Sequence, residues 1–174
     1  MQSSSVHVSD EELAFRDTQP PYINPPVPFT GLIEGVLQEG HKIIVMGSVL
    51  STGENRFEVN FQMGYNDNEI AFHFNPRFEE SGYVVCNTKQ LGTWGPEEKK
   101  MQMPFQKGSP FEICFKVESS AFKVMVSKNI FMEYAHRLPF HKFNGISIKG
   151  GVHLSYVSIQ MERSQKTDYL KDAD

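Results

Sequence analysis

The sequence predicts an all-β protein, folded as a two-sheet antiparallel sandwich. From residue 29 onward, short segments alternate apolar and polar residues with the period of two that is typical of half-buried β-strands. Turn-forming residues separate these segments, and helical periodicity is almost absent. With 174 residues, of which 39% are hydrophobic and 12% aromatic, the chain is long enough for one domain with a substantial core.

The two ends of the chain lack this pattern, and we expect them to be tails. Residues 1–19 are polar and serine-rich, and SDEE at residues 9–12 has the form of a capping box before a short helical turn. So short a helix is marginal without packing. Five prolines between positions 20 and 28 mark the start of the domain, which we place at residues 20–161, followed by a charged tail at residues 162–174.

Within the domain, residues 56–64 show the clearest alternation, with Phe57, Val59 and Phe61 on one face. We expect a turn at residues 66–68, NDN, to lead into the next strand, so that Asn60 lies on the same polar face as His73. Further strands are expected at residues 42–50, 83–89, 111–117, 121–127, 130–137, 145–149 and 152–161.

Polar groups at strand spacing are concentrated in residues 71–98. Read with period two, the segment that starts at Ala71 places Phe72, Phe74 and Phe78 on one face. The opposite face carries a row of hydrogen-bonding groups, which are His73, Asn75 and Arg77.

The strand at residues 83–89 adds Asn87, and a glycine-bearing segment then presents Trp94, the only tryptophan, followed by Glu97 and Lys99. A sugar ring offers hydroxyl groups on its rim and an apolar C–H face that can stack on an indole. Imidazole, amide, guanidinium and carboxylate groups beside one large aromatic side chain therefore favour a carbohydrate-binding site.

These residues carry a resemblance to a known family. The pattern H-x-N-x-R at residues 73–77, V-x-N at 85–87 and W-G-x-E-x-K at 94–99 resembles the carbohydrate-recognition domain of the galectins, which are β-galactoside-binding lectins. The resemblance covers roughly residues 21–161. The surrounding short segments, such as FNPRF and VVCNT, are most similar to the N-terminal domain of a tandem-repeat galectin. It implies a jelly-roll-like sandwich of about eleven antiparallel strands, with the sugar on a concave sheet.

The resemblance also implies which side chains contact the sugar, namely His73, Asn75, Arg77, Asn87, Trp94, Glu97 and Lys99. Lys99 departs from the family pattern, which usually has arginine at that position. Asn60 lies just beyond this set, and we expect it to be a secondary contact for a longer glycan. The implied partners are β-galactoside-containing glycans of glycoproteins and glycolipids, bound without a cofactor. Weak self-association as a homodimer stays open.

The amino-acid composition argues against two other classes of partner, which are nucleic acids and membranes. A formal net charge of −4 and an isoelectric point near 5.9 argue against a surface for nucleic acid or anionic membranes, because either would need a dense basic patch. We find no apolar run of signal-peptide or membrane-spanning length. We therefore expect synthesis in the cytoplasm, and any extracellular role that the resemblance implies would need non-classical secretion.

Cys86 and Cys114 lie in separate expected strands, so we interpret them as reduced structural thiols. The remaining histidines share no metal-ligand spacing with each other or with cysteine, and no metal site is expected; they are His7, His41, His136, His141 and His153.

Two other functions stay open at this point. One is an interaction protein with the galectin fold whose sugar site is weakened or vestigial, and the departure at Lys99 is the only motif change that favours it. The other is a glycan-cleaving enzyme that uses two carboxylates as an acid/base pair. The candidates are Glu79, Glu80, Glu97 and Glu98. Glu97 and Glu98 would point to opposite sides of an extended segment, which disfavours these two as a pair.

Overall fold

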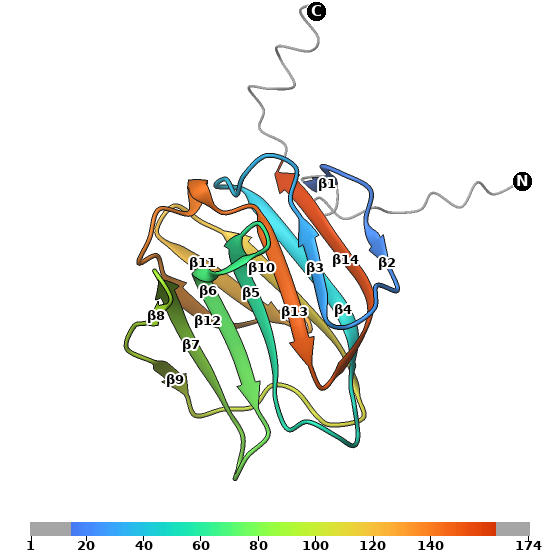
Figure 1. Cartoon of the computed structure of the whole chain (residues 1–174). Coiled ribbons are helices and arrows are strands. Elements are labelled where there is room, and N and C mark those ends of the chain that lie inside the picture. Colours follow the sequence, from blue (N-terminus) through green and yellow to red (C-terminus); the bar gives the residue numbers. More distant parts are fainter. Residues whose placement is uncertain (1–14, 163–174) are drawn as a thin grey trace, which may run out of the picture.

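The computed structural model describes residues 15–162, which form two antiparallel seven-stranded sheets packed face to face (Figure 1). The first sheet has the order β1-β14-β4-β10-β11-β12, with β2 also paired to β14. Its strands are β1 (Phe15–Asp17), β2 (Tyr22–Ile23), β4 (His41–Val49), β10 (Pro110–Val117), β11 (Ala121–Val126), β12 (Asn129–Ala135) and β14 (Val152–Glu162).

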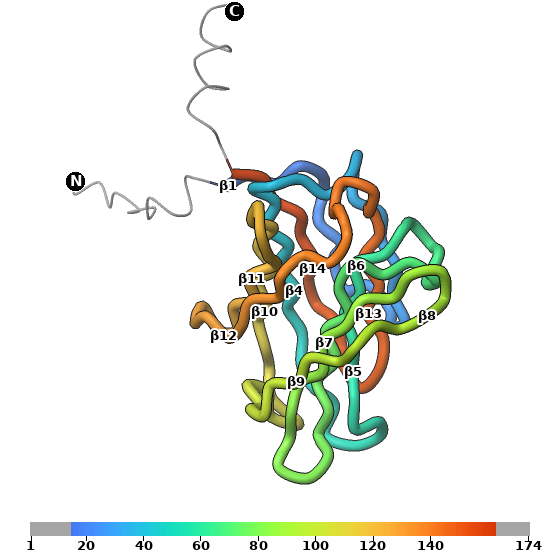
Figure 2. Tube along the Cα trace, turned by 90° about the vertical axis from the view of Figure 1, so that its left-hand side faces the viewer, coloured from blue at the N-terminus to red at the C-terminus, as the bar shows by residue number. Residues whose placement is uncertain are grey.

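The second sheet has the order β3-β13-β5-β6-β7-β8, with β9 also paired to β7. Its strands are β3 (Phe29–Leu32), β5 (Phe57–Met63), β6 (Asn66–Arg77), β7 (Tyr83–Gln90), β8 (Thr93–Trp94), β9 (Glu98–Lys100) and β13 (Gly145–Gly150). One 3₁₀ turn, η1 (Phe140–Lys142), is the only helical element among the residues described. Figure 2 shows the two layers from the side. The all-β sandwich predicted from the sequence is confirmed.

The described residues contain fourteen strands, more than the eleven or so that were expected. The additional strands include β1, β2, β8 and β9, which have only two or three residues each. Segments this short cannot display an alternating pattern, so periodicity does not reveal them.

Two boundaries inside the domain differ from the prediction by more than one residue. The chain turns at residues 64 and 65 and not at residues 66–68, because Gly64 adopts the positive φ of 56° that a two-residue hairpin turn requires. Met63 consequently pairs with Asn66, and β6 begins there. At the other boundary, β12 ends at Ala135, so Arg137 lies in the loop before η1 and outside the strand expected at residues 130–137.

The first sheet extends on one side into the segment that we expected to be a tail. Phe15 pairs with Glu162 and Asp17 with Gln160, which places β1 at the sheet edge beside the end of β14. The ammonium groups of Lys42 and Lys116 lie 4.6 and 5.5 Å from the centroid of the Phe15 ring. The helical turn expected from residue 9 onward falls outside the described residues, apart from Phe15.

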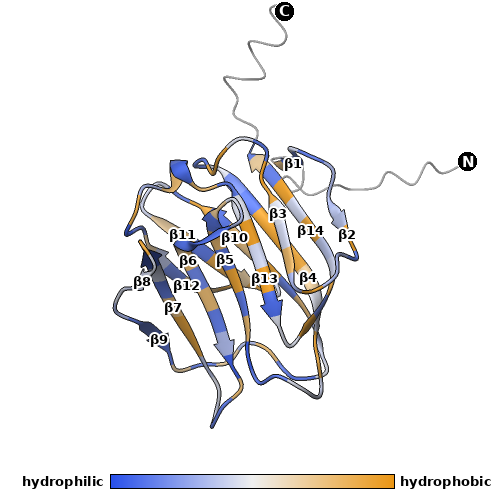
Figure 3. Cartoon of the chain, viewed as in Figure 1, coloured by the Kyte–Doolittle hydropathy of each residue, from blue (hydrophilic) through white to orange (hydrophobic). Residues whose placement is uncertain are grey.

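Alternating side chains from the two sheets meet in an aromatic core between the layers. Phe72 of β6 stacks on Tyr134 of β12 with ring centroids 4.7 Å apart, and Phe61 of β5 meets Phe115 of β10 at 5.1 Å. All four rings are fully buried. Each such side chain contributes roughly 1.5–3 kcal/mol through burial. Figure 3 shows the same alternation as orange and blue bands along the strands.

Both cysteines are buried, in separate strands as the sequence analysis expected. Burial raises the pKa of the Cys86 thiol far above its ordinary value, which keeps the thiol protonated and unreactive. Within residues 15–162, no helix has the length and apolar character needed to cross a membrane.

Candidate functional site

Three neighbouring strands of the second sheet bring polar side chains into one row. The register pairs Asn60 of β5 with His73 of β6, and His73 in turn with Asn87 of β7. Alternation places these side chains on the face opposite the Phe72 and Phe74 core. The expectation that Asn60 lies beside His73 is confirmed.

An open groove of about 820 Å³ lies on this face of the sheet. Six of the predicted site residues line it, namely His73, Asn75, Arg77, Asn87, Trp94 and Glu97. Its lining also balances three acidic with three basic side chains, namely Glu54, Glu58 and Glu97 with Arg56, Arg77 and Lys149. A groove with balanced charge suits an uncharged polar ligand better than an ionic one.

The imidazole of His73 is held by two oxygen acceptors. Its Nδ1 atom lies 2.6 Å from Oδ1 of Asn60 and 3.2 Å from the carboxylate of Glu58. Nδ1 therefore carries a proton, and in the neutral ring Nε2 is left as an acceptor. Burial by itself would raise the pKa of Glu58, but the hydrogen bonds from His73 and Asn60 outweigh burial and lower that pKa to about 2.

Asn60 lies next to His73, as predicted, and is buried among its hydrogen-bond partners. Its Nδ2 donates to Glu58 at 3.0 Å while its Oδ1 faces His73, and the residue is 1% exposed. Asn60 is not among the residues that line the groove. Its amide therefore orients the neighbouring imidazole, and this use was not foreseen from the sequence.

Asn75 and Arg77 follow on the same strand face and are joined by a hydrogen bond. Nδ2 of Asn75 donates to the Phe57 carbonyl at 2.7 Å, and Nε of Arg77 donates to Oδ1 of Asn75 at 2.9 Å. The guanidinium carbon of Arg77 lies 5.9 Å from the centroid of the Tyr83 ring. These contacts fix the side chains and leave the outer guanidinium nitrogens of Arg77 available to a ligand.

Trp94 stands at the edge of the groove and is 43% exposed, in agreement with the expectation of a ring on a rim. Its ring centroid lies 4.6 Å from that of His73, with the two planes 52° apart. The ammonium group of Lys89, the residue paired with Trp94 across the hairpin, lies 5.2 Å from the indole centroid. The indole therefore stands next to the imidazole and offers apolar surface to the groove.

Glu97 and Lys99 complete the predicted set. Nζ of Lys99 lies 3.8 Å from the Glu97 carboxylate, and both side chains are about half exposed, at 51% and 44%. An exposed pair at this distance contributes little to stability. Lys99 lies beside the groove but does not line it.

The sequence analysis did not identify Glu58, Arg56 or Lys149. Glu58 precedes Asn60 by two residues on the same strand face, and that spacing was a signal that could have found it. Lys149 lies on the neighbouring strand β13 opposite Glu58, with Nζ 4.0 Å from the carboxylate, and Arg56 makes a two-pronged ion pair with Glu79. Their partners are distant in sequence, so no local pattern reveals them.

The four carboxylates that were considered as members of a catalytic pair are not gathered at one site. Glu79 is held by Arg56 and Glu98 by Arg137, and of the four only Glu97 lines the groove. The groove therefore does not bring two of them together. No group of three or more potential metal-binding side chains occurs within residues 15–162.

An antiparallel sandwich that carries a polar groove with an exposed tryptophan on one sheet is the architecture of a carbohydrate-binding lectin. The family described as Galactoside-binding lectin matches residues 28–159 of the chain. The chain therefore belongs to the galectin family, as the sequence motifs predicted.

Relatives with similar sequences are also galectins. Galectin-4 of Rattus norvegicus is 44% identical over 141 residues, which cover 80% of this chain and 43% of that protein. Galectin-6 of Mus musculus is 41% identical over 152 residues, which cover 87% of this chain and 50% of that protein. The chain thus spans about half of the length of these relatives or less.

The solved structure of galectin LEC-6 from Caenorhabditis elegans has the same fold, with a TM-score of 0.73 and 27% identity. The match covers 80% of this chain and 94% of that structure. Galectins are carbohydrate-binding lectins without catalytic activity, and membership of this family supports the prediction that the domain is not an enzyme.

Proposed function

We propose that the domain binds β-galactosides such as lactose and N-acetyllactosamine-type glycans in the groove on the second sheet. Binding is reversible, needs no metal, and leaves the sugar unchanged. The observation that carries this proposal is the geometry around His73. Its ring is held at Nδ1, its Nε2 has no hydrogen-bond partner among residues 15–162, and the exposed indole of Trp94 lies 4.6 Å away.

The arrangement suits the axial 4-hydroxyl of galactose. Nε2 of His73 would accept a hydrogen bond from this hydroxyl, while Asn75 and Arg77 supply further polar atoms on the same face. Glucose differs from galactose by an equatorial hydroxyl at this carbon. It would leave these groups unpaired, at roughly 1–3 kcal/mol for each buried group.

The rest of the sugar would lie toward Trp94. Asn87 and Glu97 would hold the 6-hydroxyl, and the indole would stack on the apolar face of the ring. Arg77, Glu97 and Lys99 would reach the second sugar, which is glucose or N-acetylglucosamine. Because the groove is open, much of a disaccharide stays in water and the affinity is modest, so multivalent glycans or self-association would supply avidity.

One observation favours a weaker alternative. The pair of Lys99 and Glu97 is long, at 3.8 Å, and exposed, so the part of the site that would hold the second sugar lacks a rigid cation. A galectin-fold interaction protein with reduced sugar binding would fit this feature.

The experiment that tests the proposal compares lactose with cellobiose by calorimetric titration, in the presence and absence of EDTA. The two disaccharides differ only in the configuration of one hydroxyl, which is the one assigned to His73. We expect binding of lactose, at least about tenfold weaker binding of cellobiose, and no effect of EDTA. Equal affinities would overturn the assignment of His73, and no binding of either sugar would support the alternative.

A further inference from the structure

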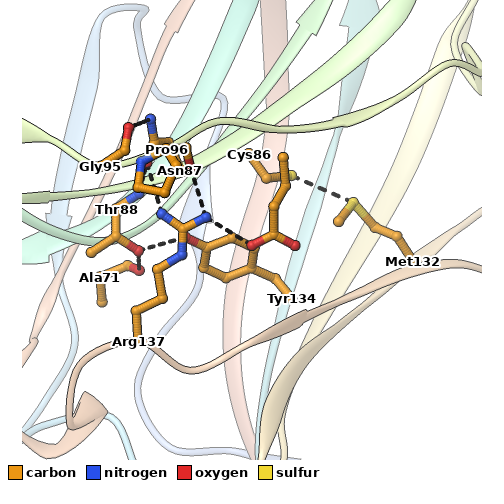
Figure 4. A network of polar contacts seen from close by, with 10 residues as sticks. Ala71, Cys86, Asn87, Thr88, Gly95, Pro96, Met132, Tyr134 and Arg137 are labelled. Atoms are coloured by element: carbon orange, nitrogen blue, oxygen red, sulfur yellow. Dashed lines mark hydrogen bonds and ion pairs between the residues drawn. The ribbon is translucent and has the colours of Figure 1, made fainter.

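Arg137 crosses from the first sheet to the second and contacts the segment that carries Trp94. It follows β12 in the loop before η1, whereas its hydrogen-bond acceptors belong to β7, to the β8–β9 connection and to β9. Figure 4 shows the guanidinium among these groups. None of the sugar-binding motifs contains this residue.

The guanidinium has three acceptors. One terminal nitrogen donates to Oδ1 of Asn87 at 3.0 Å. The other donates to the carbonyl of Pro96 and to the carboxylate of Glu98, both at 2.8 Å. Only a planar group with several N–H donors can engage three acceptors in this way, and a lysine ammonium could not reproduce the fork.

These contacts determine which way the Asn87 amide faces. Its Oδ1 accepts from the Thr88 backbone at 2.7 Å and from Arg137, and its Nδ2 donates to the Gly95 carbonyl at 2.8 Å. Both lone pairs of the oxygen are thus occupied, and one N–H remains. Since Asn87 is 3% exposed and lines the groove, the remaining N–H is the donor that the amide can offer to a ligand.

The guanidinium also fits closely between its neighbours. Its carbon lies 5.1 Å from the centroid of the Tyr134 ring, and the Tyr134 hydroxyl is 2.6 Å from Oγ1 of Thr88. On the other side, a Cβ at Gly95 would lie only 3.0 Å from the guanidinium nitrogen and 3.3 Å from the Asn87 oxygen. Glycine at this position therefore leaves the space that the Arg137 contact requires.

We propose that Arg137 is a positioning residue of the sugar site. It fixes the Asn87 amide with its N–H toward the groove and holds the two residues that flank Glu97, through the Pro96 carbonyl and the Glu98 carboxylate, so that one donor and one carboxylate acceptor face the same ligand hydroxyl. This inference rests on the proposed function. The ligands that it favours are galactosides with a free 6-hydroxyl, because that group both accepts and donates a hydrogen bond.

The test uses the full chain and compares methyl β-galactoside with its 6-deoxy analogue in the wild-type protein, Arg137→Met and Arg137→Lys. We expect Arg137→Met to lose affinity for the galactoside by about tenfold while affinity for the 6-deoxy analogue falls much less. The ratio of the two affinities therefore approaches one. In Arg137→Lys the ratio should be smaller than in the wild-type protein but above one, because lysine retains the charge but cannot engage several acceptors as the planar guanidinium does.

Lys123→Met is the matched control. Lys123 is 24% exposed at its side chain, against 25% for Arg137, and pairs with Glu118 at 3.9 Å on the first sheet, away from the groove. We expect this variant to leave both affinities unchanged. The inference is overturned if Arg137→Met leaves the ratio of the two affinities unchanged. Loss of affinity for both sugars by the same factor would be such a result, and it would show general destabilisation. If Arg137→Met does not fold, the ratio in Arg137→Lys decides in the same way.

A ligand-free measurement separates this inference from the proposed function. In ¹⁵N-labelled protein, the side-chain N–H₂ resonances of Asn87 should shift and exchange faster with water in Arg137→Lys than in the Lys123→Met control. Failure of the wild-type protein to bind any galactoside would defeat the proposed function alone. Unchanged Asn87 resonances would defeat the inference alone.

Discussion

Nδ1 of His73 lies 2.6 Å from Oδ1 of Asn60, and the two residues face each other in the β5–β6 register. Asn60 in turn donates to Glu58, whose carboxylate also lies 3.2 Å from Nδ1. The three side chains thus form a closed group, in which two contacts hold the imidazole and the third joins Asn60 to Glu58. The state of His73 that a galactoside would meet is therefore set by residues that the sugar need not touch.

The first prediction concerns this orientation. Asn60→Ala removes the acceptor at 2.6 Å, so Nδ1 keeps only the longer contact with Glu58 and the ring is less well fixed. We expect lactose affinity to fall by about 1–1.5 kcal/mol, the scale of one hydrogen bond. Calorimetric titration measures it, and thermal unfolding of the same variant reports any loss of stability. Unchanged lactose affinity in a folded variant would mean that the contact with Glu58 alone is enough to orient the His73 ring.

The second prediction concerns pH. The pKa of Glu58 is lowered to about 2 from a usual value near 4.5, so its stabilising contribution is fully present above pH 4.5 and is lost as the pH falls toward 2. The shift corresponds to at most about 3 kcal/mol. Glu58→Gln should therefore be less stable than the wild-type protein at pH 6, and the difference should shrink between pH 4.5 and pH 2. Urea unfolding at a series of pH values measures it, and a constant difference would contradict the assignment.

The third prediction concerns the exposed indole. Trp94→Ala should weaken lactose binding by about 2 kcal/mol or more, because the stacking surface is lost. Since the side chain is 43% exposed, the unfolding temperature should change little. Leu91→Ala, at a position that is 85% exposed in the preceding turn, is the control and should bind normally. Normal lactose affinity in a folded Trp94→Ala protein would rule out the proposed stacking.

The fourth prediction concerns the first strand. A chain that begins at Gln19 lacks β1 and with it the pairing to β14 and the contacts of the Phe15 ring with Lys42 and Lys116. We expect a loss of about 1–2 kcal/mol in the free energy of unfolding. Lactose affinity should stay the same, because β1 belongs to the sheet without the groove. A chain that begins at Phe15 is the control, and equal stability of the two chains would show that β1 contributes nothing.

The sequence allowed the sandwich and most of the groove to be predicted for one physical reason. Strands such as β5 and β6 bury one face, so their residues alternate, and the polar face is visible as the complement of Phe57, Phe61 and Phe72. The same reasoning failed for the hairpin between these strands. Three polar residues at 66–68 resemble a turn, yet the positive φ of Gly64 places the turn two residues earlier.

The parts of the site that were missed depend on contacts between strands or between sheets. Glu58 gains its role through the neighbouring β6, and Arg137 through a loop that approaches β7 from the opposite sheet. Asn60 was found, but its 1% exposure comes from packing that no local pattern records. The sequence therefore indicates which face is polar. The three-dimensional register is needed to separate the groups that can contact a ligand from the groups that support them.

Lys99 is the one motif residue that departs from the family pattern, and the structure shows where its ammonium lies. Its ammonium lies 3.8 Å from the Glu97 carboxylate and 5.7 Å from the centroid of the Tyr83 ring, without lining the groove. Glu97 therefore has an exposed and distant cation as its partner. A guanidinium at this position could brace Glu97 with one edge and still offer N–H donors to a second sugar.

The fifth prediction is that Lys99→Arg raises the affinity for lactose and N-acetyllactosamine by about 0.5–1.5 kcal/mol, the scale of one improved hydrogen bond. Affinity for methyl β-galactoside should change much less, because His73, Asn75, Asn87 and Trp94 are unaltered. Lys100→Arg, one position along β9, is the matched control and should leave both affinities unchanged. Calorimetric titration of the disaccharides and the monosaccharide separates the two contributions. Equal or lower disaccharide affinity in Lys99→Arg would show that the surrounding groups are adapted to lysine.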